Sequence, residues 1–417
     1  MIDGGAVLVE VPGDLGGGPA FARQADHHGP KAGLLVDMRV QGELQQKPVL
    51  LRGQLNPKRG CHVEMIKGWH LDDVLRPIHG GPDGGPEPLW DFSTNANALG
   101  PNPVLLEHLR RVDPSRYPDP LYRRLREALA EAHGVRPEQV AVGTGTSELI
   151  HRLARWSYLR GPWLLLPPTF SEYARAARAL DLPLWEARSP GEFLDLLPRS
   201  AVAFLCVPNN PTGEVYPFLE KAVRRAGGVL VLDLAYHDLL ESPVPLPEGA
   251  FRLYSPNKAH GLTGVRAGYL VAPLDLTYFQ NLAPSWPVSA YGEALLLGQL
   301  DPEARSWLEA SRRELIRLRG LLAEGLRGLG LEVRESPANF LLVRVGRASE
   351  VARALRARGI RVRDATSFGL PEWLRLSAQK EEAIRALLAA LEEVLVDLER
   401  GAHGLPGGGG AAATGGL

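Results

Sequence analysis

The chain has 417 residues, 45% of them hydrophobic and 23% charged, and its 47 Lys and Arg nearly balance its 48 Asp and Glu. This balance leaves no net basic charge to bind nucleic acid or an anionic membrane, and two cysteines, Cys61 and Cys206, cannot build a disulfide framework or a Cys-rich metal site. No apolar run reaches the ~20 residues of a membrane helix, so we expect a cytoplasmic protein without nucleic-acid, membrane or metal partners.

The two ends of the chain differ in composition from its middle. Residues 1–64 are rich in glycine and lack sustained hydrophobic periodicity, so we expect a disordered arm there, or an extension upstream of a natural start at Met65. Residues 401–417 are low in complexity and mostly Gly and Ala, and we expect them to form a disordered tail.

In the middle of the chain, short β-branched or apolar runs alternate with amphipathic stretches of helical period. This alternation is typical of a mostly parallel sheet covered by helices, and we assign residues 102–297 to a large α/β domain of that kind. The expected strands are Gln139–Val142, Trp163–Leu166, Ala201–Val207, Gly228–Leu232 and Tyr269–Val271, and the expected helices include Pro120–His133 and Ser147–Trp156.

A smaller α/β domain is predicted over residues 298–400, because the pattern restarts after Asp301 with a long helical stretch. Its expected elements are helix Pro302–Gly328, strand Asn339–Val345, a helix near Ser349–Arg358, a strand near Ile360–Arg363, strand Leu374–Ser377 and helix Lys380–Glu399.

Lys258 is the first candidate catalytic residue. It follows a predicted strand in a loop of small and turn-forming residues, in a chain that carries most of its positive charge on arginine. A lysine that forms a Schiff base must be neutral part of the time, which partial burial and a nearby cation achieve. Taken alone, the pattern favours an ordinary surface lysine. The neighbouring motifs decide between a surface lysine and a Schiff-base lysine.

Asp233 ends the apolar run Val229-Leu-Val-Leu, which predicts a buried strand with a carboxylate at its C-terminal end. A buried carboxylate is costly unless it is paired with a cation, and the protonated pyridinium nitrogen of pyridoxal phosphate is such a cation. Tyr236, three residues later, is placed to reach the phenolic oxygen of the same cofactor. The alternative for Asp233 is a helix N-cap.

Three further segments carry polar groups suited to that cofactor. Asn210 precedes a proline that holds it extended, so its amide is a candidate donor to the phenolic oxygen, with an ordinary Asn-Pro turn as the alternative. Thr146 and Ser147 open a helix after a Gly-rich turn, where backbone N–H groups bind phosphate. Ser255 and Arg266 flank Lys258 and would complete the phosphate site.

These residues stand in the order and approximate spacing of the fold-type-I pyridoxal-phosphate enzymes, the aspartate aminotransferase superfamily, which the chain resembles from about His79 to Glu399. The resemblance implies an α/β fold with a large cofactor-binding domain and a smaller C-terminal α/β domain. It also implies pyridoxal 5'-phosphate as the cofactor. Lys258 would form the Schiff base with it, and Asp233 would pair with its pyridinium nitrogen. One departure is Asn257, where the family usually carries Ser or Thr.

Two more motifs resemble the histidinol-phosphate aminotransferase branch, namely Ser115-Arg-Tyr-Pro-Asp-Pro and the run that ends in Trp-Leu-Arg-Leu-Ser377. By this resemblance Tyr117 reaches the cofactor phosphate of a neighbouring subunit, so a homodimer is expected. Phe170 is implied to stack on the cofactor ring, Arg375 to bind the substrate carboxylate, and Asn339 to lie near the substrate.

The early motif His79-Gly-Gly, followed by Trp90-Asp-Phe-Ser-Thr-Asn, resembles instead the threonine-phosphate decarboxylases of cobalamin biosynthesis. In that group the matching histidine approaches the substrate phosphate, which makes His79 a substrate-binding candidate together with Asn97. Residues 65–101 are therefore expected to contribute to the active site. Asn97-Ala stands where the family usually has Asn-Pro.

Three functions follow from these resemblances. The favoured one is decarboxylation of L-threonine O-3-phosphate; the first alternative is transamination of histidinol phosphate or an aromatic amino acid, and the second is a non-catalytic, cofactor-binding regulator. The substrate bond that lies perpendicular to the cofactor ring decides between the two reactions, so Lys258 and Asp233 serve both. The intact set of Lys258, Asp233, Tyr236 and Arg266 argues against the regulator.

Overall fold

The computed structural model describes residues 51–56, 60–65 and 79–403, and the chain forms two compact units, Met1–Arg76 and Pro77–Leu417. The predicted boundaries between the N-terminal segment, the large domain and the small domain remain predictions. Among the described residues, no helix combines the length and the apolar character that crossing a membrane requires.

The first unit contains a β-hairpin. Its strands β1 (Leu51–Asn56) and β2 (Gly60–Met65) pair antiparallel, with Leu51 opposite Met65. This hairpin differs from the arm without regular structure that the glycine content predicts, because turn-forming residues after Leu55 let two short runs pair. The rest of residues 1–64 lies outside the described part of the chain.

A seven-stranded sheet is the centre of the second unit, with the order β4-β10-β9-β8-β7-β5-β6. Only β10 runs antiparallel to its two neighbours, so the sheet is mostly parallel, as predicted. Its strands are β4 (Val140–Gly143), β5 (Trp163–Leu165), β6 (Leu184–Glu186), β7 (Val202–Cys206), β8 (Val229–Asp233), β9 (Phe251–Tyr254) and β10 (Gly268–Val271).

Helices cover both faces of this sheet, because successive side chains of a strand point to opposite faces. In β7, Val202 and Phe204 pack with α4 and α5, whereas Ala203 and Leu205 pack with α6 and α7. Around β4 and β10 the second face is covered by α2, α3 and α10. These helices are α2 (Pro103–Arg110), α3 (Arg123–His133), α4 (Thr146–Trp156), α5 (Glu172–Ala179), α6 (Pro190–Leu196), α7 (Leu219–Arg225) and α10 (Ala290–Gly298).

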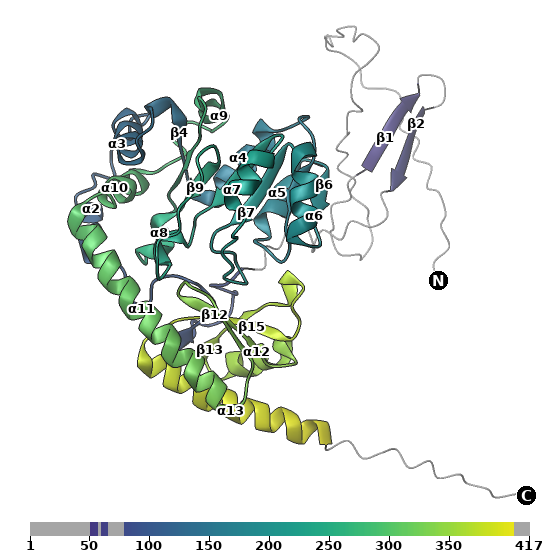
Figure 1. The fold of residues 1–417 in the computed structure, drawn as a ribbon, viewed down its shortest axis with the longest axis vertical. Coiled ribbons are helices and arrows are strands. Elements are labelled where there is room, and N and C mark those ends of the chain that lie inside the picture. Colours follow the sequence, from purple (N-terminus) through teal and green to yellow (C-terminus); the bar gives the residue numbers. More distant parts are fainter. Residues whose placement is uncertain (1–50, 57–59, 66–78, 404–417) are drawn as a thin grey trace, which may run out of the picture. The chain divides into compact units, whose positions relative to one another are not determined.

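The long helix α11 (Pro302–Gly328) leads from this sheet to a second one (Figure 1), a four-stranded antiparallel sheet of order β11-β12-β15-β14. Leu322 and Leu326 of α11 pack there with Leu387 and Leu391 of the terminal helix. The other elements are β11 (Val333–Glu335), β12 (Phe340–Arg344), α12 (Ala348–Ala357), β14 (Arg363–Asp364), β15 (Trp373–Ser377) and α13 (Glu381–His403).

Two expected elements differ in the structure. The strand expected near residues 360–363 is split into β13 (Ile360–Arg361), which pairs in parallel with β3 (Trp90–Asp91), and β14, which pairs with β15. The chain thus changes sheets within four residues, which a continuous apolar pattern cannot reveal. In addition, α13 extends to His403, beyond the expected start of the tail.

Candidate active site

The candidate residues meet because four strands end at one edge of the seven-stranded sheet. Strands β7, β8 and β9 are parallel to one another. Strands β4 and β9 each pair antiparallel with β10, so β4 runs in the same direction as β9. Asp233 is the last residue of β8, and the segments that follow β7, β9 and β4 carry Asn210, Lys258 and Thr146. In mostly parallel sheets, ligands bind outside the carboxyl ends of the strands.

Asp233 is the deepest of these groups, with 1% of its surface exposed. Its Oδ2 accepts a hydrogen bond from the hydroxyl of Tyr173 at 2.8 Å, and its Oδ1 accepts one from the backbone N–H of Ala235 at 3.0 Å. Burial raises the pKa of Asp233, while the Tyr173 hydroxyl and the Lys258 charge oppose this rise. Tyr173 was not predicted, because a tyrosine inside an amphipathic helix carries no sequence signal beyond core packing.

Lys258 lies on the short helix α8 (Pro256–Ala259) and is half-buried. Its Nζ lies 4.7 Å from the centre of the Tyr236 ring, so the predicted pair is brought together. Asn257 does not present a free amide to the site. It donates from Nδ2 to Ser255 Oγ at 3.0 Å and accepts at Oδ1 from the backbone N–H of Ala267 at 3.1 Å, which fixes the loop that carries Ser255 and Arg266.

The predicted phosphate site has the required parts. Helix α4 begins at Thr146, after Gly145 with φ +89°, and a Cβ on Gly145 would lie 3.0 Å from a guanidinium nitrogen of Arg266. The Arg266 side chain is therefore held beside the helix N-terminus, where backbone N–H groups and the helix dipole attract anions. Glycine at position 145 permits both the backbone angle and this approach.

Together these residues fit pyridoxal phosphate. The buried Asp233 carboxylate suits a protonated ring nitrogen, Lys258 lies near Tyr236, and the α4 N-terminus with Arg266 suits the phosphate. Ser147 follows Thr146 in the first turn of α4, and Ser255, 8% exposed, lies directly before α8.

Arg375 is buried, with 4% of its surface exposed, and is aimed at the same edge from β15. It donates to Asn210 Oδ1 and, at 2.6 Å, to the backbone carbonyl of Ser93. Arg375 uses Oδ1 of Asn210 as its acceptor, and the role of the Asn210 amide nitrogen as a donor to the cofactor remains a prediction. Arg375 Nε has no hydrogen-bond partner among the described residues.

A second buried arginine, Arg363, lies directly opposite Arg375 in the β14–β15 pair and is 5% exposed. Its Nη2 donates to Ser367 Oγ at 2.7 Å. Burial, and secondly the positive charge of Arg375, lower the pKa of Arg363 to about 10. The sequence analysis did not single out Arg363, because it is one of several arginines in the run from Arg356 to Arg363 and nothing local distinguishes it from the others.

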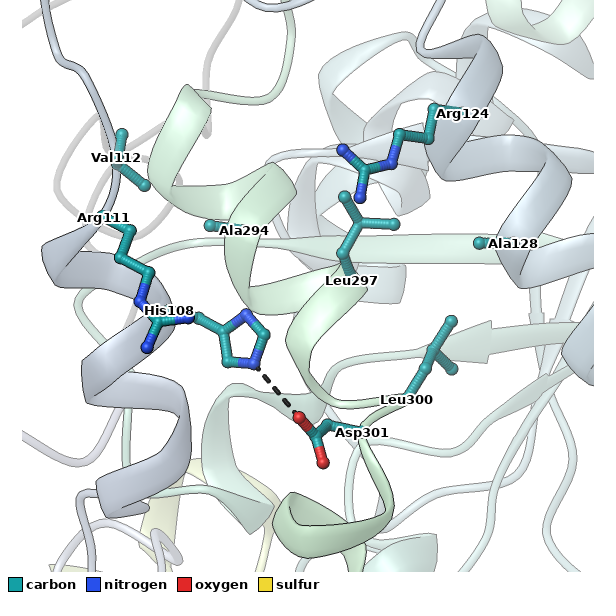
Figure 2. Close-up of a pocket in the computed structure, with 9 residues that line it drawn as sticks. All are labelled: His108, Arg111, Val112, Arg124, Ala128, Ala294, Leu297, Leu300 and Asp301. Atoms are coloured by element: carbon teal, nitrogen blue, oxygen red, sulfur yellow. Dashed lines mark hydrogen bonds and ion pairs between the residues drawn. The ribbon is translucent and has the colours of Figure 1, made fainter.

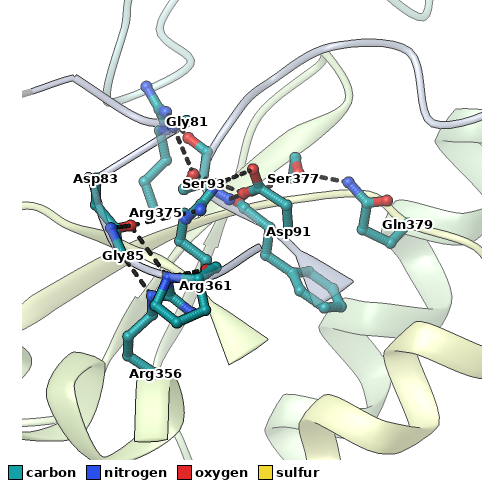
Figure 3. A network of polar contacts seen from close by, with 12 residues as sticks. Gly81, Asp83, Gly85, Asp91, Ser93, Arg356, Arg361, Arg375, Ser377 and Gln379 are labelled. Atoms are coloured by element: carbon teal, nitrogen blue, oxygen red, sulfur yellow. Dashed lines mark hydrogen bonds and ion pairs between the residues drawn. The ribbon is translucent and has the colours of Figure 1, made fainter. Parts of the chain in front are cut away.

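The segment before α2 positions Arg375 (Figure 3). Ser93, whose carbonyl accepts from Arg375, donates from its backbone N–H and its hydroxyl to Asp91 Oδ1, at 2.7 and 2.6 Å. Asp91 in turn accepts from Arg361 at 3.1 Å, and Arg356 binds Asp83 at 2.7 Å. This chain of contacts ties the N-terminal segment to the four-stranded sheet and its helices.

Two asparagines predicted near the substrate make mainly internal contacts. Asn97 donates to the backbone carbonyl of Ala259 at 2.9 Å and to Ser311 Oγ at 2.8 Å, and its Oδ1 accepts from Leu99 N–H. Each polar atom of this side chain thus has a partner within the chain, and the contact with Ala259 holds the backbone beside Lys258; the predicted role of Asn97 toward the substrate remains a prediction. Asn339 donates to the Asn95 carbonyl at 3.2 Å, while its Oδ1 is buried without a partner among the described residues.

His79 and Phe170 lie side by side, with ring centres 5.4 Å apart. His79 Nε2 lies 3.0 Å from Glu172 Oε1, and Phe170 makes an edge contact with Tyr173. The structure therefore connects His79 to the Tyr173–Asp233 pair through Phe170, while the contacts implied for His79 with the substrate and for Phe170 with the cofactor remain predictions.

Tyr117 is not enclosed by its own chain. Its side chain is 79% exposed and stacks on Trp286, with ring centres 4.5 Å apart.

A hollow of about 520 Å³ lies among α2, α3, α10 and the start of α11 (Figure 2), and none of its lining residues is a predicted site residue. They are His108, Arg111, Val112, Arg124, Ala128, Ala294, Leu297, Leu300 and Asp301.

Comparisons with known proteins agree with this arrangement. The family described as aminotransferase class I and II matches residues 88–391. The chain is 33% identical to histidinol-phosphate aminotransferase of Anaeromyxobacter sp. (strain Fw109-5), over 73% of this chain and 90% of that protein. It is 31% identical to histidinol-phosphate aminotransferase of Haloferax volcanii, over 81% of this chain and 97% of that protein.

A solved structure is similar as well. The crystal structure of L-threonine-O-3-phosphate decarboxylase from Porphyromonas gingivalis aligns with a TM-score of 0.64 and 26% identity, over 73% of this chain and 99% of that chain. The predicted fold class is confirmed.

Proposed function

Since the chain belongs to the class I and II aminotransferase family, we propose that it is an aminotransferase for a phosphate-bearing amine such as histidinol phosphate. The cofactor of this family is pyridoxal phosphate, and it is the cofactor of this protein. When bound, it withdraws electrons from the substrate carbon that carries the amine.

The observation that carries the proposed substrate class is the pair of buried arginines. Arg363 and Arg375 lie opposite each other on β14 and β15 and are 5% and 4% exposed. Two adjacent buried cations repel each other and are desolvated, so an anion between them is strongly favoured. Arginine presents a planar fork that matches phosphate and carboxylate oxygens, so a phosphate dianion is a suitable ligand for this pair.

The residues of the chain itself have three roles in the proposed reaction. The Lys258 amine, half-buried beside Tyr236, is positioned to take a proton from the substrate carbon and return it. The Asp233 carboxylate, held by Tyr173, stabilises positive charge on the ring nitrogen. Arg375, fixed by Asn210 and the Ser93 carbonyl, holds the anionic end of the substrate and so orients the bond that breaks.

A specific observation favours a second candidate, decarboxylation of L-threonine O-3-phosphate. Besides the two arginines, His79 lies against Phe170, the residue that is expected to stack on the cofactor ring, so His79 is a third candidate among the groups that could bind anions of the substrate. A substrate with both a phosphate and a carboxylate can pair with more of these groups than an amine that carries a phosphate alone. The likeness to the Porphyromonas gingivalis decarboxylase supports this candidate, whereas the named relatives support transamination.

Product analysis separates the two. The full-length protein with pyridoxal phosphate is given histidinol phosphate plus 2-oxoglutarate in one reaction and L-threonine O-3-phosphate in another. Glutamate in the first reaction, detected by mass spectrometry, is the outcome that the primary proposal predicts. Aminopropanol phosphate in the second without glutamate in the first would replace it by the decarboxylase, and conversion of unphosphorylated amino acids alone would contradict both.

A further inference from the structure

Asn257 stands directly before Lys258 on α8, at a position where the family usually carries Ser or Thr. It is 1% exposed, and its side chain contacts only the chain itself. Nδ2 donates to Ser255 Oγ at 3.0 Å and to the backbone carbonyl of Ala267, and Oδ1 accepts from the backbone N–H of Ala267 at 3.1 Å. Both hydrogens of the amide are therefore used, and this side chain has no donor left for an anion.

The two contacts with Ala267 decide which way round the Asn257 amide lies. A backbone N–H only donates and a backbone carbonyl only accepts, so Oδ1 lies at the N–H and Nδ2 at the carbonyl. The second hydrogen of Nδ2 then points at Ser255 Oγ, which has to accept it. The hydroxyl hydrogen of Ser255 is thereby directed away from Asn257, and among the described residues the structure shows no acceptor for it. This hydrogen is available to an anion.

The backbone of Arg266 depends on the same asparagine. Its φ is +59°, in the left-handed region that residues with a Cβ rarely adopt. The peptide unit after Arg266 is held at both ends, because its carbonyl accepts from Thr144 Oγ1 at 3.1 Å and its N–H, that of Ala267, donates to Asn257. Such a backbone conformation persists only where the surroundings determine it. These two side chains therefore hold the backbone from which the Arg266 guanidinium reaches Gly145, directly before α4.

Ser255 and the start of α4 converge at Gly268, the first residue of β10. A Cβ at Gly268 would lie 2.9 Å from the carbonyl oxygen of Tyr254 and 3.0 Å from Cα of Gly145. Tyr254 directly precedes Ser255, and Gly145 directly precedes α4, so both segments of the predicted phosphate site lie against the same glycine. The hydroxyl and the guanidinium that this asparagine orients thus belong to one anion site.

We propose that Asn257 is a positioning residue for the cofactor phosphate, which orients the Ser255 hydroxyl as a donor and holds the Arg266 backbone, and that serine cannot replace it. A serine hydroxyl has one hydrogen and a shorter side chain, so it cannot bind both the N–H and the carbonyl of Ala267 and also donate to Ser255. Affinity for the phosphate then depends on a side chain that does not touch it. The inference concerns the cofactor alone and goes beyond the choice between the two candidate reactions.

Equilibrium dialysis tests this role. The full-length protein, prepared as the holoenzyme, is dialysed against pyridoxal phosphate or against pyridoxal, which lacks the phosphate, and the bound compound is measured by its absorbance. Asn257→Ser is expected to weaken binding of pyridoxal phosphate about tenfold, the loss of one charge-assisted hydrogen bond, and to change the binding of pyridoxal less than about twofold. Wild-type affinity for pyridoxal phosphate would show that serine serves equally well, and an equal loss for both compounds would place the effect outside the phosphate site. Either result overturns the inference.

Asn102→Ser is the matched control, the same substitution at another buried asparagine. Asn102 is 0% exposed, donates from Nδ2 to the Ala304 carbonyl at 3.1 Å and accepts at Oδ1 from the Val104 N–H at 3.0 Å. Its loss is expected to lower the free energy of unfolding and to leave the ratio of the two affinities unchanged. A fall in that ratio as large as in Asn257→Ser would attribute the effect to lost stability and contradict the proposed role.

A double-mutant cycle tests the part of the effect that passes through Ser255. In the Ser255→Ala protein there is no hydroxyl to orient, so Asn257→Ser is expected to weaken binding of pyridoxal phosphate only about threefold further, through Arg266 alone. A tenfold loss in both backgrounds would show that Asn257 does not act through the Ser255 hydroxyl.

A measurement on the wild-type protein covers the case in which Asn257→Ser does not fold. The Ala267 amide hydrogen is bonded to a side chain of the chain itself, so its protection does not require the cofactor. Hydrogen exchange resolved to single residues by mass spectrometry is expected to be slow at Ala267 both in the holoenzyme and in the full-length protein stripped of cofactor. Fast exchange in the stripped protein would show that the cofactor, and not Asn257, fixes this loop.

Discussion

At the scale of single residues, the hydroxyl of Tyr173 controls the charge of Asp233. Tyr173→Phe removes the 2.8 Å hydrogen bond to a carboxylate that is 1% exposed. A hydrogen bond to a charged group contributes about 1.5–3 kcal/mol, so the Asp233 pKa rises further and kcat falls by about tenfold or more. Steady-state kinetics checks this, with Tyr216→Phe, another buried tyrosine, as control. Equal kcat in Tyr173→Phe and wild type would contradict this role.

Buried histidine also makes stability depend on pH. His260 directly follows α8, is 2% exposed and lies with Nδ1 3.0 Å from Asn102 Nδ2, and burial lowers its pKa from 6.5 to about 4. Between these values the unfolded chain binds more protons than the folded one, so stability rises with pH and is lost as pH falls from 6.5 towards 4. His133 acts in the same direction, with a pKa also lowered to about 4.

Urea denaturation at several pH values tests this sign. His260→Gln removes one titrating group, so the dependence of unfolding free energy on pH is expected to become shallower by up to about 1.4 kcal/mol per pH unit within that window. The unfolding free energy of His260→Gln is lower than that of the wild type at neutral pH if Asn102 loses its hydrogen-bond partner. The test is therefore the slope of the unfolding free energy against pH. An unchanged slope would show that His260 is protonated in the folded protein.

At the scale of elements, the segment from Asp83 to Ser93 acts on the substrate through Arg375. Asp91→Asn weakens the contacts that fix Ser93, whose carbonyl accepts from Arg375. Since Arg375 itself remains, we expect KM to rise about fivefold with little change in kcat, the signature of lost ground-state binding. Asp113→Asn, which alters a similar Asp–Ser turn on the exposed surface, is the control. A fall in kcat at constant KM would contradict the assignment.

Most elements could be predicted from the sequence because the helices bury one face with a clear period and the central strands, which are buried on both faces, are short apolar runs. The strands ending at Cys206 and Asp233 are uniformly apolar, and their ends indicated the site. The split of residues 360–364 between two sheets depends on pairing with Trp90, far away in sequence, so local pattern could not show it. Arg363 and Tyr173 were missed for the same reason, because their roles arise from tertiary contacts.

At the scale of the whole molecule, we propose that two chains complete each other's sites. Tyr117 is 79% exposed and stacked on Trp286, itself 43% exposed, which leaves a contiguous aromatic surface for a second copy. If Tyr117 acts across the dimer, Lys258→Ala and Tyr117→Ala homodimers are each defective. Co-refolding them is then expected to restore activity, because one site per heterodimer has both wild-type residues. No recovery in a mixture that contains heterodimers would place Tyr117 outside the neighbouring site.

The most direct test of the central claim is borohydride trapping followed by peptide mass spectrometry. Borohydride reduces the bond between a lysine nitrogen and the cofactor aldehyde carbon, which leaves the cofactor permanently attached. We expect the label on Lys258, and we expect histidinol phosphate or L-threonine O-3-phosphate to prevent labelling while unphosphorylated histidinol at the same concentration does not. Labelling of another lysine, no labelling, or equal protection by the unphosphorylated amine would contradict the account.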